Sequence, residues 1–565
     1  MQSRRGRIAP NIEIPNVSKS FYSLSQQPID DNVIMSDIDN SPPRSLIIVT
    51  VLGILTYLLL NFLCSVSDPL EPPIVTTRIP YIGHILGLGR RKFNYYVDLS
   101  QKTRLPILTI RVPGAKMYIV NTPELIQAVQ KLHKKLAFPP ISAAFANQLC
   151  GVSKKARDVL AVNVNGDEGD WGLNMEATHV MKKAMAPGPG LDGMNRVMVR
   201  NVAESLDGLI GEEKESVKIE LHAWLRSLIT IATTESVYGP RNPYRAVKVQ
   251  DSFWELESQM MRLLIGILPS VFARKGIAAR GRVTKAFESY YSASDFKDAS
   301  LLAQARLEVN IKHGVPIKDV ARYETVIGVA IIVNTAPALF WLIFFIFSNP
   351  ELLEEIRSEI EAIVETSVTE DGTVVRSLDV TNVKTKCHLL LSTFQETLRH
   401  RSAGTSVRKV MEDTLLDDTW LLKKNSIIQM PGRVIHMDSK IWGSDVADFN
   451  PRRFLKDGNV KRPNPAAFRT FGGGTTLCPG RHFATNEILA VVSMFVMRFD
   501  MKPVDGNWKL PKSDNTNVTT VIMEPDTDIG VVVSQRKEVG DGKWTFKLSD
   551  SKTIASVAIE DRVDS

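Results

Sequence analysis

The sequence is poor in cysteine, with four in 565 residues. So few cysteines in so long a chain do not indicate a disulfide framework, and we expect the protein to fold in a reducing compartment. The sequence also has no internal repeat and no nucleic-acid-binding motif. Its net charge of +7 therefore points to an anionic membrane surface or an acidic protein partner rather than to nucleic acid, although an evenly solvated basic surface explains the same excess.

The remaining composition is that of an ordinary globular protein, with 44% hydrophobic and 23% charged residues. Apolar residues at three- and four-residue spacing predict helices over 123–136, 194–210, 220–237 and 350–364. Shorter apolar runs predict strands over 107–112, 117–120, 426–430 and 529–534. We therefore expect one large domain over residues 85–536, mainly α with minor β.

One uncharged run, Leu46–Val66, would as a helix span about 30 Å, the thickness of a bilayer core. It begins more than forty residues into the chain and has no small-residue cleavage site, which argues against a removable signal peptide. We interpret 46–66 as a single transmembrane anchor. Arg44 alone lies close upstream, whereas basic residues follow at 78 and 90–92, and this bias places the C-terminal part in the cytosol.

The segments that flank the anchor and the domain are polar or rich in proline. Residues 1–45 have mixed charge and few aromatics, which predicts a disordered extension. Residues 67–84 contain several prolines and predict an extended, semi-rigid connector, and 537–565 forms a C-terminal tail. Glycosylation sequons begin at Asn16 and Asn517, of which only the first would be lumenal in this orientation.

A second long apolar run, Thr325–Phe347, has two interpretations. It is long enough for another transmembrane helix, or it is a helix buried through the centre of a soluble domain. Asn334, Thr335 and Pro337 lie in its middle, where lipid would leave polar and freed backbone groups unsatisfied. A second span would also divide the chain between the two sides of the membrane. We therefore favour the buried helix.

The run Phe471–Arg481, which reads FGGGTTLCPGR, places Cys478 in a glycine-rich loop. A sulfur ligand to a large flat cofactor needs a bend that exposes it, and glycine lets the backbone approach closely because it has no Cβ. Backbone N–H groups around such a turn can point at the sulfur and tune its electron donation. No such loop surrounds the remaining cysteines, Cys64, Cys150 and Cys387.

This loop resembles the cysteine loop of cytochromes P450, Phe-x-x-Gly-x-(Arg/His)-x-Cys-x-Gly. Phe471, Gly474, Cys478 and Gly480 fill four of its five defined positions. The resemblance implies the cytochrome P450 fold, with Cys478 as the axial thiolate ligand of the iron of haem b. It also implies that Phe471 packs near the sulfur and that Arg481 begins the following helix.

Other segments resemble the same family, in the family's order. Glu396 and Arg399 are three residues apart and so lie on one face of a helix, where they can form an ion pair. The later Pro-x-Arg-Phe segment resembles the one whose arginine completes a buried triad with that pair, and we assign this role to Arg453. Arg452 stands where many family members have an acid.

In this family the central helix carries an acid–threonine pair beside the haem. Here Thr335 is kept, Asn334 replaces the acid and Ile332 replaces the usual glycine. A threonine hydroxyl can hold a water that relays protons to bound oxygen, whereas an amide has no ionisable proton, so the relay must differ. Without the other motifs, Thr-x-Pro in a helix would indicate only a kink.

Two departures concern the contacts to the haem propionates. Thr476 occupies the position of the usual Arg or His, and the usual Trp-x-x-x-Arg is absent because Trp171 precedes Met175 at that spacing. Three nearby basic residues are candidates for the propionate contact instead: His179, Lys182 and Lys183. The alternative is that these three form a solvated basic face.

The departures resemble one branch of the family. Asn334–Trp341 and Thr476–Arg481 are similar to the branch of sterol 7α- and 12α-hydroxylases and prostacyclin synthase, and Met523–Asp528 looks like that branch's final hairpin tip. The resemblance to cytochromes P450 covers about residues 69–536. The long N-terminal extension resembles that of fungal enzymes of secondary metabolism.

The resemblance implies a monooxygenase that uses O2 and electrons from an NADPH-dependent reductase docked on the basic, cysteine-side face. Its substrate would be a lipophilic small molecule such as a terpenoid, steroid or alkaloid, and its location the endoplasmic reticulum, with a cytosolic catalytic domain. One alternative is a redox-neutral rearrangement enzyme, as in prostacyclin synthase. A second is a non-catalytic haem-binding membrane protein.

Overall fold

The computed structural model describes residues 44–65, 67–211, 214–455, 464–517, 519–537 and 542–549. The predicted disorder of the N-terminal extension, the sequon at Asn16 and most of the predicted C-terminal tail lie outside these residues. The chain divides into two units, Met1–Leu58 and Leu59–Ser565.

The first helix, α1 (Arg44–Ser65), contains the predicted anchor and is 22 residues long. Every side chain from Ile48 to Leu60 is exposed, so this stretch of the helix buries no apolar face. Within the described ranges, the only helix with the length and apolar character to span a membrane is Ile317–Phe347, and Ile48–Leu60 is a shorter apolar helix. The anchor at 46–66 therefore stays a prediction.

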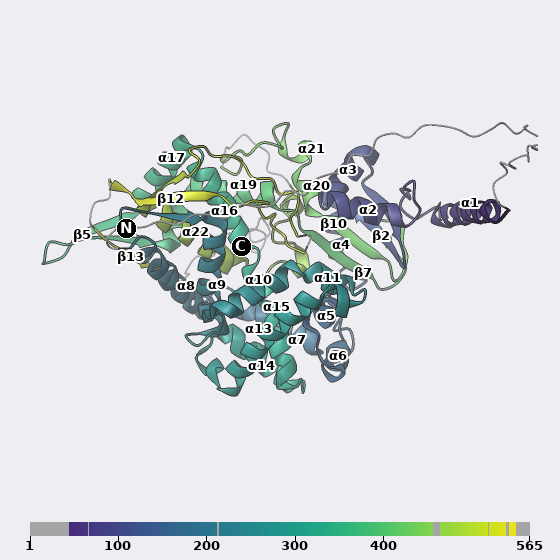
Figure 1. Ribbon diagram of the computed structural model, residues 1–565, viewed down its shortest axis with the longest axis horizontal. Coiled ribbons are helices and arrows are strands. Elements are labelled where there is room, and N and C mark those ends of the chain that lie inside the picture. Colours follow the sequence, from purple (N-terminus) through teal and green to yellow (C-terminus); the bar gives the residue numbers. More distant parts are fainter. Residues whose placement is uncertain are drawn as a thin grey trace, which may run out of the picture. The chain divides into compact units, whose positions relative to one another are not determined.

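The second unit is mainly helical, as the sequence predicts (Figure 1). Its α-helices are, in order, α2 (Ile82–Arg91), α3 (Asn94–Thr103), α4 (Pro123–Lys131), α5 (Pro139–Cys150), α6 (Lys154–Ala161), α7 (Leu173–Ala184), α8 (Pro189–Asp207), α9 (Leu221–Tyr238), α10 (Val247–Ser258), α11 (Met260–Ile265), α12 (Pro269–Phe272), α13 (Arg274–Ser292), α14 (Leu301–Lys312), α15 (Ile317–Ile332), α16 (Thr335–Phe347), α17 (Pro350–Glu361), α18 (Val380–Lys386), α19 (His388–Arg401), α20 (Gly432–His436), α21 (Ser439–Trp442) and α22 (Arg481–Arg498).

The strands form small sheets. They are β1 (Ile107–Val112), β2 (Ala115–Val120), β3 (Leu136–Ala137), β4 (Ser216–Glu220), β5 (Val364–Val368), β6 (Val374–Asp379), β7 (Thr405–Val410), β8 (Thr414–Leu416), β9 (Trp420–Leu422), β10 (Ile427–Pro431), β11 (Phe499–Pro503), β12 (Gly530–Gln535) and β13 (Lys543–Lys547). The largest sheet has the order β1-β2-β10-β7-β3. Figure 1 shows this sheet on one side of the second unit and β12 and β13 on the other, with α9, α16 and α22 between them.

Two predicted helices are shorter than their apolar patterns. The helix predicted over 123–136 ends at Lys131, because Leu136 enters β3 and pairs with Val410 of β7. The helix predicted over 350–364 ends at Glu361, because Val364 opens the β5–β6 hairpin opposite Leu378. In both cases an apolar residue that fits the helical period is instead used by a strand, which periodicity alone does not distinguish.

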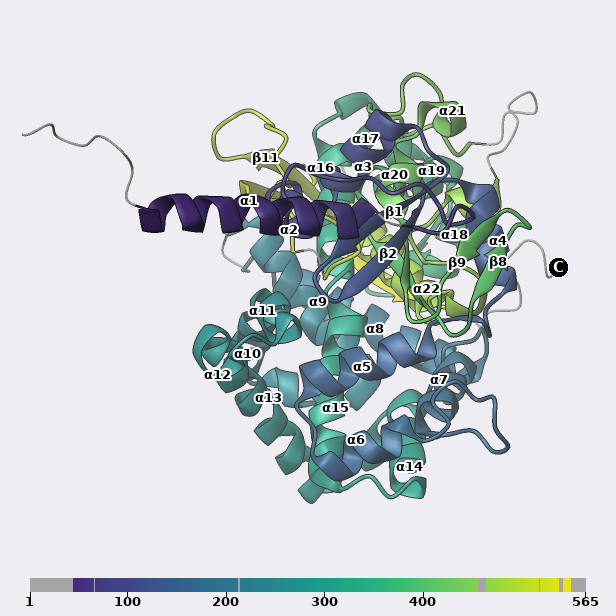
Figure 2. The same cartoon turned by 90° about the vertical axis from the view of Figure 1, so that its right-hand side faces the viewer.

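The apolar run at 325–347 lies inside the core, as the buried-helix interpretation predicts. All thirteen residues of α16 are buried, and Figure 2 shows α15 among α5, α13 and α14. The helix is interrupted between Ile332 and Thr335. Pro337 has no N–H to donate to the Val333 carbonyl, which explains why the regular helix breaks there.

The connector and the described part of the tail are both bound to the domain. Buried Glu71 accepts a hydrogen bond from the Tyr118 hydroxyl at 2.8 Å and forms an ion pair with Lys116 at 2.5 Å. Strand β13 pairs in parallel with β6, which makes residues 543–547 part of a three-stranded sheet. At the second sequon, the Asn517 amide nitrogen donates to the Glu257 carboxylate at 2.8 Å, so the atom that would carry a glycan is engaged inside the fold.

Candidate functional site

Cys478 lies in a tight loop just before α22. Its N–H donates to the Phe471 carbonyl at 2.9 Å, which closes the loop. Gly472 and Gly474 have φ of +81° and +57°, in the left-handed region that favours glycine. A Cβ on Gly474 would lie 3.2 Å from the Gln130 side chain. Glycine at 472 and at 474 is therefore needed for the shape of this loop.

Backbone donors surround the Cys478 sulfur. Burial raises the pKa of this thiol, and the backbone N–H groups of Gly480 and Arg481, together with the Arg481 charge, act in the opposite direction. A Cβ on Gly480 would lie 3.9 Å from Sγ, so this glycine packs directly beside the sulfur. Burial raises the pKa of Cys150 and Cys387 to about 12, which makes these thiols unreactive.

The sulfur faces a cavity of about 410 Å³. The cavity brings the cysteine loop together with the interrupted central helix and with the segment that follows Asn517. Its lining includes Cys478, Asn334, Thr335, Ala338 and Ile522. These residues are far apart in the sequence, and the fold places the two predicted catalytic residues and the predicted ligand at one site.

The Asn334 side chain links the break in the central helix to the segment that contains Val521 and Ile522. Its side-chain oxygen accepts hydrogen bonds from the backbone N–H of Val521 at 2.8 Å and of Ile522 at 3.3 Å. Thr335 is the first residue of α16 and is buried beside the cavity. The Asn334 side-chain oxygen is thus a structural acceptor, and both Asn334 and Thr335 line the cavity.

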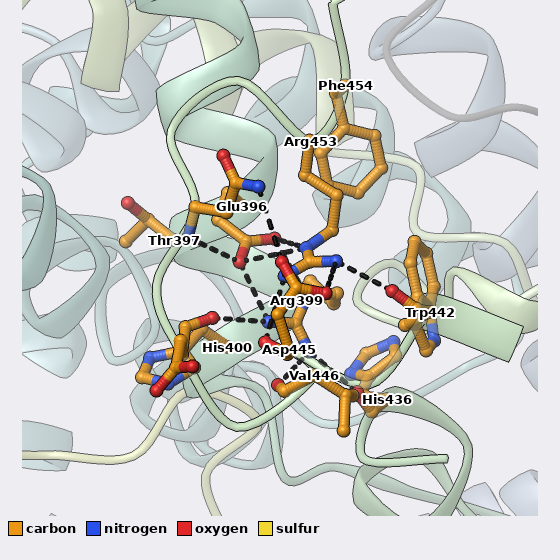
Figure 3. A network of polar contacts seen from close by, with 12 residues as sticks. Glu396, Thr397, Arg399, His400, His436, Trp442, Asp445, Val446, Arg453 and Phe454 are labelled. Carbon is orange, nitrogen blue, oxygen red and sulfur yellow. Dashed lines mark hydrogen bonds and ion pairs between the residues drawn. The ribbon is translucent and has the colours of Figure 1, made fainter. Parts of the chain in front are cut away.

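The structure brings Glu396, Arg399 and Arg453 together in one network (Figure 3). The Arg399 Nε and Nη2 each donate to a Glu396 oxygen at 2.7 Å, and both side chains are 0% exposed. The Arg453 Nε donates to both oxygens of the same carboxylate at 3.2 Å. Arg453 also pairs with Asp445 at 2.9 Å. One buried carboxylate therefore holds two guanidinium groups from different segments.

Arg452, one residue earlier, lies outside this network. It pairs with Glu355 at 2.5 Å, and about half of each side chain is exposed. The arginine that stands where many family members have an acid is therefore a surface residue.

The three basic residues considered for the propionate contact are exposed and do not line the cavity. His179 packs against Trp171, with ring centroids 5.1 Å apart, and the Lys182 Nζ donates to the Thr475 carbonyl at 2.8 Å. Instead, the Thr476 hydroxyl accepts a hydrogen bond from the Arg408 Nη2 at 2.7 Å. The structure thus favours the solvated-face alternative for those three residues.

Arg408 was missed by sequence reasoning, although it lines the cavity and is 2% exposed. It lies on β7, opposite Ile428 of β10. A single arginine in a short strand resembles any half-exposed strand residue, so no sequence signal separates it from a solvated one. Only the pairing of β7 within the sheet turns its side chain toward the cavity.

The residues present fit a haem. The cavity offers a sulfur at Cys478 that backbone N–H groups surround, and the buried guanidinium of Arg408 that can meet a carboxylate. A thiolate-ligated haem supplies the activation of dioxygen. The chain's own residues would hold the ring through Cys478 and Arg408 and leave Thr335 and Ile522 to face a bound molecule.

Comparisons with known proteins identify the family of the chain. A family model described as Cytochrome P450 matches residues 280–529. The chain is 36% identical over 494 residues to the cytochrome P450 monooxygenase nodJ of Hypoxylon pulicicidum, which covers 86% of this chain and 93% of that protein. It is 24% identical over 455 residues to cytochrome P450 7B1 of Mus musculus, which covers 77% of this chain and 86% of that protein.

A solved structure shares the fold. Retinoic acid-bound cyanobacterial CYP120A1 is similar with a TM-score of 0.62 at 18% identity, over 82% of this chain and 99% of that chain. At this identity the likeness concerns the mainly helical fold.

The Glu396 network generates a stability prediction. Glu396→Gln removes the counter-charge of the buried Arg399 and one of the two carboxylates that pair with Arg453, and we expect a loss of roughly 3–5 kcal/mol. The matched control is Glu355→Gln, which breaks the exposed pair of Arg452 and is expected to lose less than about 1 kcal/mol. Chemical denaturation and the yield of folded protein measure both. Equal losses in the two variants would contradict the role of the network.

The Asn334 contact generates a second prediction. Asn334→Leu removes the acceptor of two backbone N–H groups, each of which then loses roughly 1–3 kcal/mol of local stability. Hydrogen exchange in the peptide that covers 519–525 should become faster. Asn334→Asp keeps an acceptor oxygen and should exchange as slowly as the unmodified protein. If both variants exchange at the unmodified rate, Asn334 does not hold this segment.

Proposed function

The chain belongs to the cytochrome P450 family of monooxygenases, and from this we propose that it is a membrane-anchored enzyme that oxidises a lipophilic small molecule. The substrate we propose is a terpenoid, steroid or alkaloid-like compound of fungal secondary metabolism. The observation that carries the proposal is the cavity that joins Cys478 to the interrupted central helix at Thr335.

The lining of that cavity supports a lipophilic substrate. Beside Thr335 it contains apolar side chains from three segments, among them Ile327, Ala338, Val521 and Ile522. Pockets with mainly apolar walls and a few polar groups bind apolar molecules and orient them through those groups. A substrate here would pack against these side chains and meet few hydrogen-bonding partners.

We assign Cys478 as the axial thiolate ligand of haem b. The N–H groups of Gly480 and Arg481 are placed to temper the electron donation of the sulfur. Phe471 closes the loop through its carbonyl, and Gly474 gives the loop its turn. Electrons would come from an NADPH-dependent reductase that docks near this loop.

We assign proton delivery to the Thr335 hydroxyl through a water that it holds. Thr335 is buried at the cavity, and a hydroxyl both donates and accepts hydrogen bonds. The Asn334 oxygen already accepts two backbone N–H bonds. Asn334 would therefore position Thr335 and the adjoining helix end rather than carry protons itself.

We further propose that α1 crosses the membrane of the endoplasmic reticulum once and leaves the catalytic domain in the cytosol. A helix of 22 residues is about 33 Å long, enough for a bilayer core. Its side chains from Ile48 to Leu60 are apolar or weakly polar and all exposed. The basic residues that follow it favour this orientation.

A redox-neutral rearrangement of a peroxide is the second candidate. It is favoured by Asn334, which has no ionisable proton where the family has an acid. It is disfavoured by Thr335, whose hydroxyl remains at the cavity. The two reactions differ in their need for external electrons, which makes them separable by experiment.

The test uses microsomes that contain the full-length protein, incubated with reductase, NADPH and a panel of terpenoids, steroids and fused-ring alkaloids under ¹⁸O2. We expect a product that carries ¹⁸O only when reductase and NADPH are both present. Conversion of an organic peroxide without NADPH would establish the second candidate instead. Carbon monoxide binding with no conversion of any compound would indicate a non-catalytic haem protein.

The anchor is checked in the same preparation, since the full chain should remain in the membrane pellet after an alkaline carbonate wash.

Variants in this assay test the two assigned residues. Cys478→Ser should lose the carbon monoxide spectrum typical of thiolate ligation, whereas Cys387→Ser, which removes a buried thiol away from the cavity, should keep it. Thr335→Ala should lower the product formed per NADPH consumed by roughly tenfold or more, and Thr335→Ser should restore much of it because the hydroxyl returns. Unchanged coupling in Thr335→Ala would exclude the proton role.

A further inference from the structure

Two arginines lie buried at one part of the cavity wall, in place of the base that the cysteine loop lacks. Arg408 is 2% exposed and Arg469 is 4% exposed, and both line the cavity together with Thr476. Arg408 comes from β7, and Arg469 precedes the cysteine loop by two residues. Neither was expected from the family's pattern near the cysteine.

Strand β7 carries Arg408 and also the Ser406 hydroxyl that binds Arg469. Ser406 and Arg408 are two residues apart on β7, so their side chains point to the same face of the sheet. The Arg469 Nη2 donates to the Ser406 hydroxyl at 3.1 Å, and the Arg408 Nη2 donates to the Thr476 hydroxyl at 2.7 Å. Both guanidinium groups are thus held at the same cavity wall by neutral hydroxyl groups.

Glycine makes room for Arg469. A Cβ on Gly432 would lie 3.3 Å from the Arg469 Cβ and 2.8 Å from the Gly404 carbonyl oxygen. A larger residue at 432 would therefore displace the segment that carries Arg469. The backbone of Arg469 is fixed as well, because its N–H donates to the His436 Nε2 at 2.8 Å. The position of this arginine is set by several segments at once.

The two charges repel each other in a buried place. Burial, and then the charge of Arg469, lower the pKa of Arg408 to about 10. In the ranges that the structure describes, Arg408 forms no ion pair with a carboxylate of the chain. A buried cation without a counter-charge is costly, and the nearby charge of Arg469 adds to that cost at Arg408. An anionic group in the cavity would lower it.

We propose that Arg469 supplies the basic contact that the loop lacks at Thr476, and that it binds a propionate of the haem together with Arg408. This inference rests on the haem-thiolate function proposed above. Two guanidinium groups can each form paired hydrogen bonds to a carboxylate, which a lysine or a hydroxyl does not reproduce. This arrangement explains why a threonine is tolerated at position 476. The Thr476 hydroxyl orients Arg408, and Arg469 supplies the positive charge.

The first experiment measures how fast full-length, detergent-solubilised protein loses haem to an excess of a haem-scavenging apoglobin. Arg469→Ala should lose haem roughly tenfold to hundredfold faster, because a buried charge-assisted contact is removed. Arg469→Lys should lie between the two. Lys182→Ala is the matched control: it removes the exposed amine bound to Thr475, and the rate should not change.

The second experiment asks whether the base can be moved back to the family's position. The Thr476 hydroxyl already lies against Arg408, so an arginine introduced at 476 starts from the same wall. Arg469→Ala/Thr476→Arg should retain haem nearly as long as the unmodified protein. A general loss of packing in Arg469→Ala would not be repaired by this second substitution, so recovery identifies the charge as the cause.

The third experiment changes the ligand. The apoprotein is titrated with haem and with haem dimethyl ester, whose propionates carry no charge. The unmodified protein should prefer haem, and Arg469→Ala should lose most of that preference.

The inference is overturned if Arg469→Ala releases haem at the unmodified rate or keeps the full preference. If Arg469→Ala does not fold, the same titration of Arg469→Lys decides. A thiolate-type carbon monoxide spectrum in these variants shows that the proposed Cys478 ligation is intact, which separates failure of this inference from failure of the proposed function.

Discussion

The ion pair between Glu396 and Arg399 is the interaction on which the site depends. Because both side chains are 0% exposed, each requires the other, and the pair in turn recruits Arg453 and backbone carbonyl groups. The Arg399 Nη1 donates to the His436 carbonyl at 2.7 Å, and the His436 Nε2 accepts the Arg469 N–H at 2.8 Å. A continuous chain of polar contacts thus runs from the helical ion pair to the start of the cysteine loop.

His436 connects Arg399 to Arg469 in this chain of contacts. Burial, and then the charges of Arg399 and Arg469, lower the pKa of His436 to about 3. The ring is therefore neutral at physiological pH, and its Nε2 can accept a hydrogen bond, which a protonated ring could not. The surrounding arginines thereby keep the acceptor that positions Arg469. Electrostatics and geometry at this point depend on each other.

Four arginines around the site fall into two groups that differ in their surroundings. Arg399 and Arg453 share Glu396, and Arg453 also pairs with Asp445, so both counter-charges belong to the chain itself. Arg408 and Arg469 face the cavity, where the haem-thiolate interpretation places the propionates. The first group holds the fold together whether or not a cofactor is bound. With the proposed propionate bound, the second group would gain stabilisation from it, which would couple cofactor binding to the stability of this wall.

The sequence by itself determined the cysteine loop, the ion-pair motif and the buried character of the central apolar run, because each depends on residues that are close in the chain. Glu396 and Arg399 share a helix face through their spacing alone, and glycines beside Cys478 mark a turn. Tertiary structure alone decided the contacts of Asn334, whose partners are about 190 residues away. It also decided that Arg408 is buried at the cavity while His179, Lys182 and Lys183 are exposed. Such contacts arise from how strands and loops pack against each other, and local patterns carry no record of which distant backbone or hydroxyl a side chain will meet.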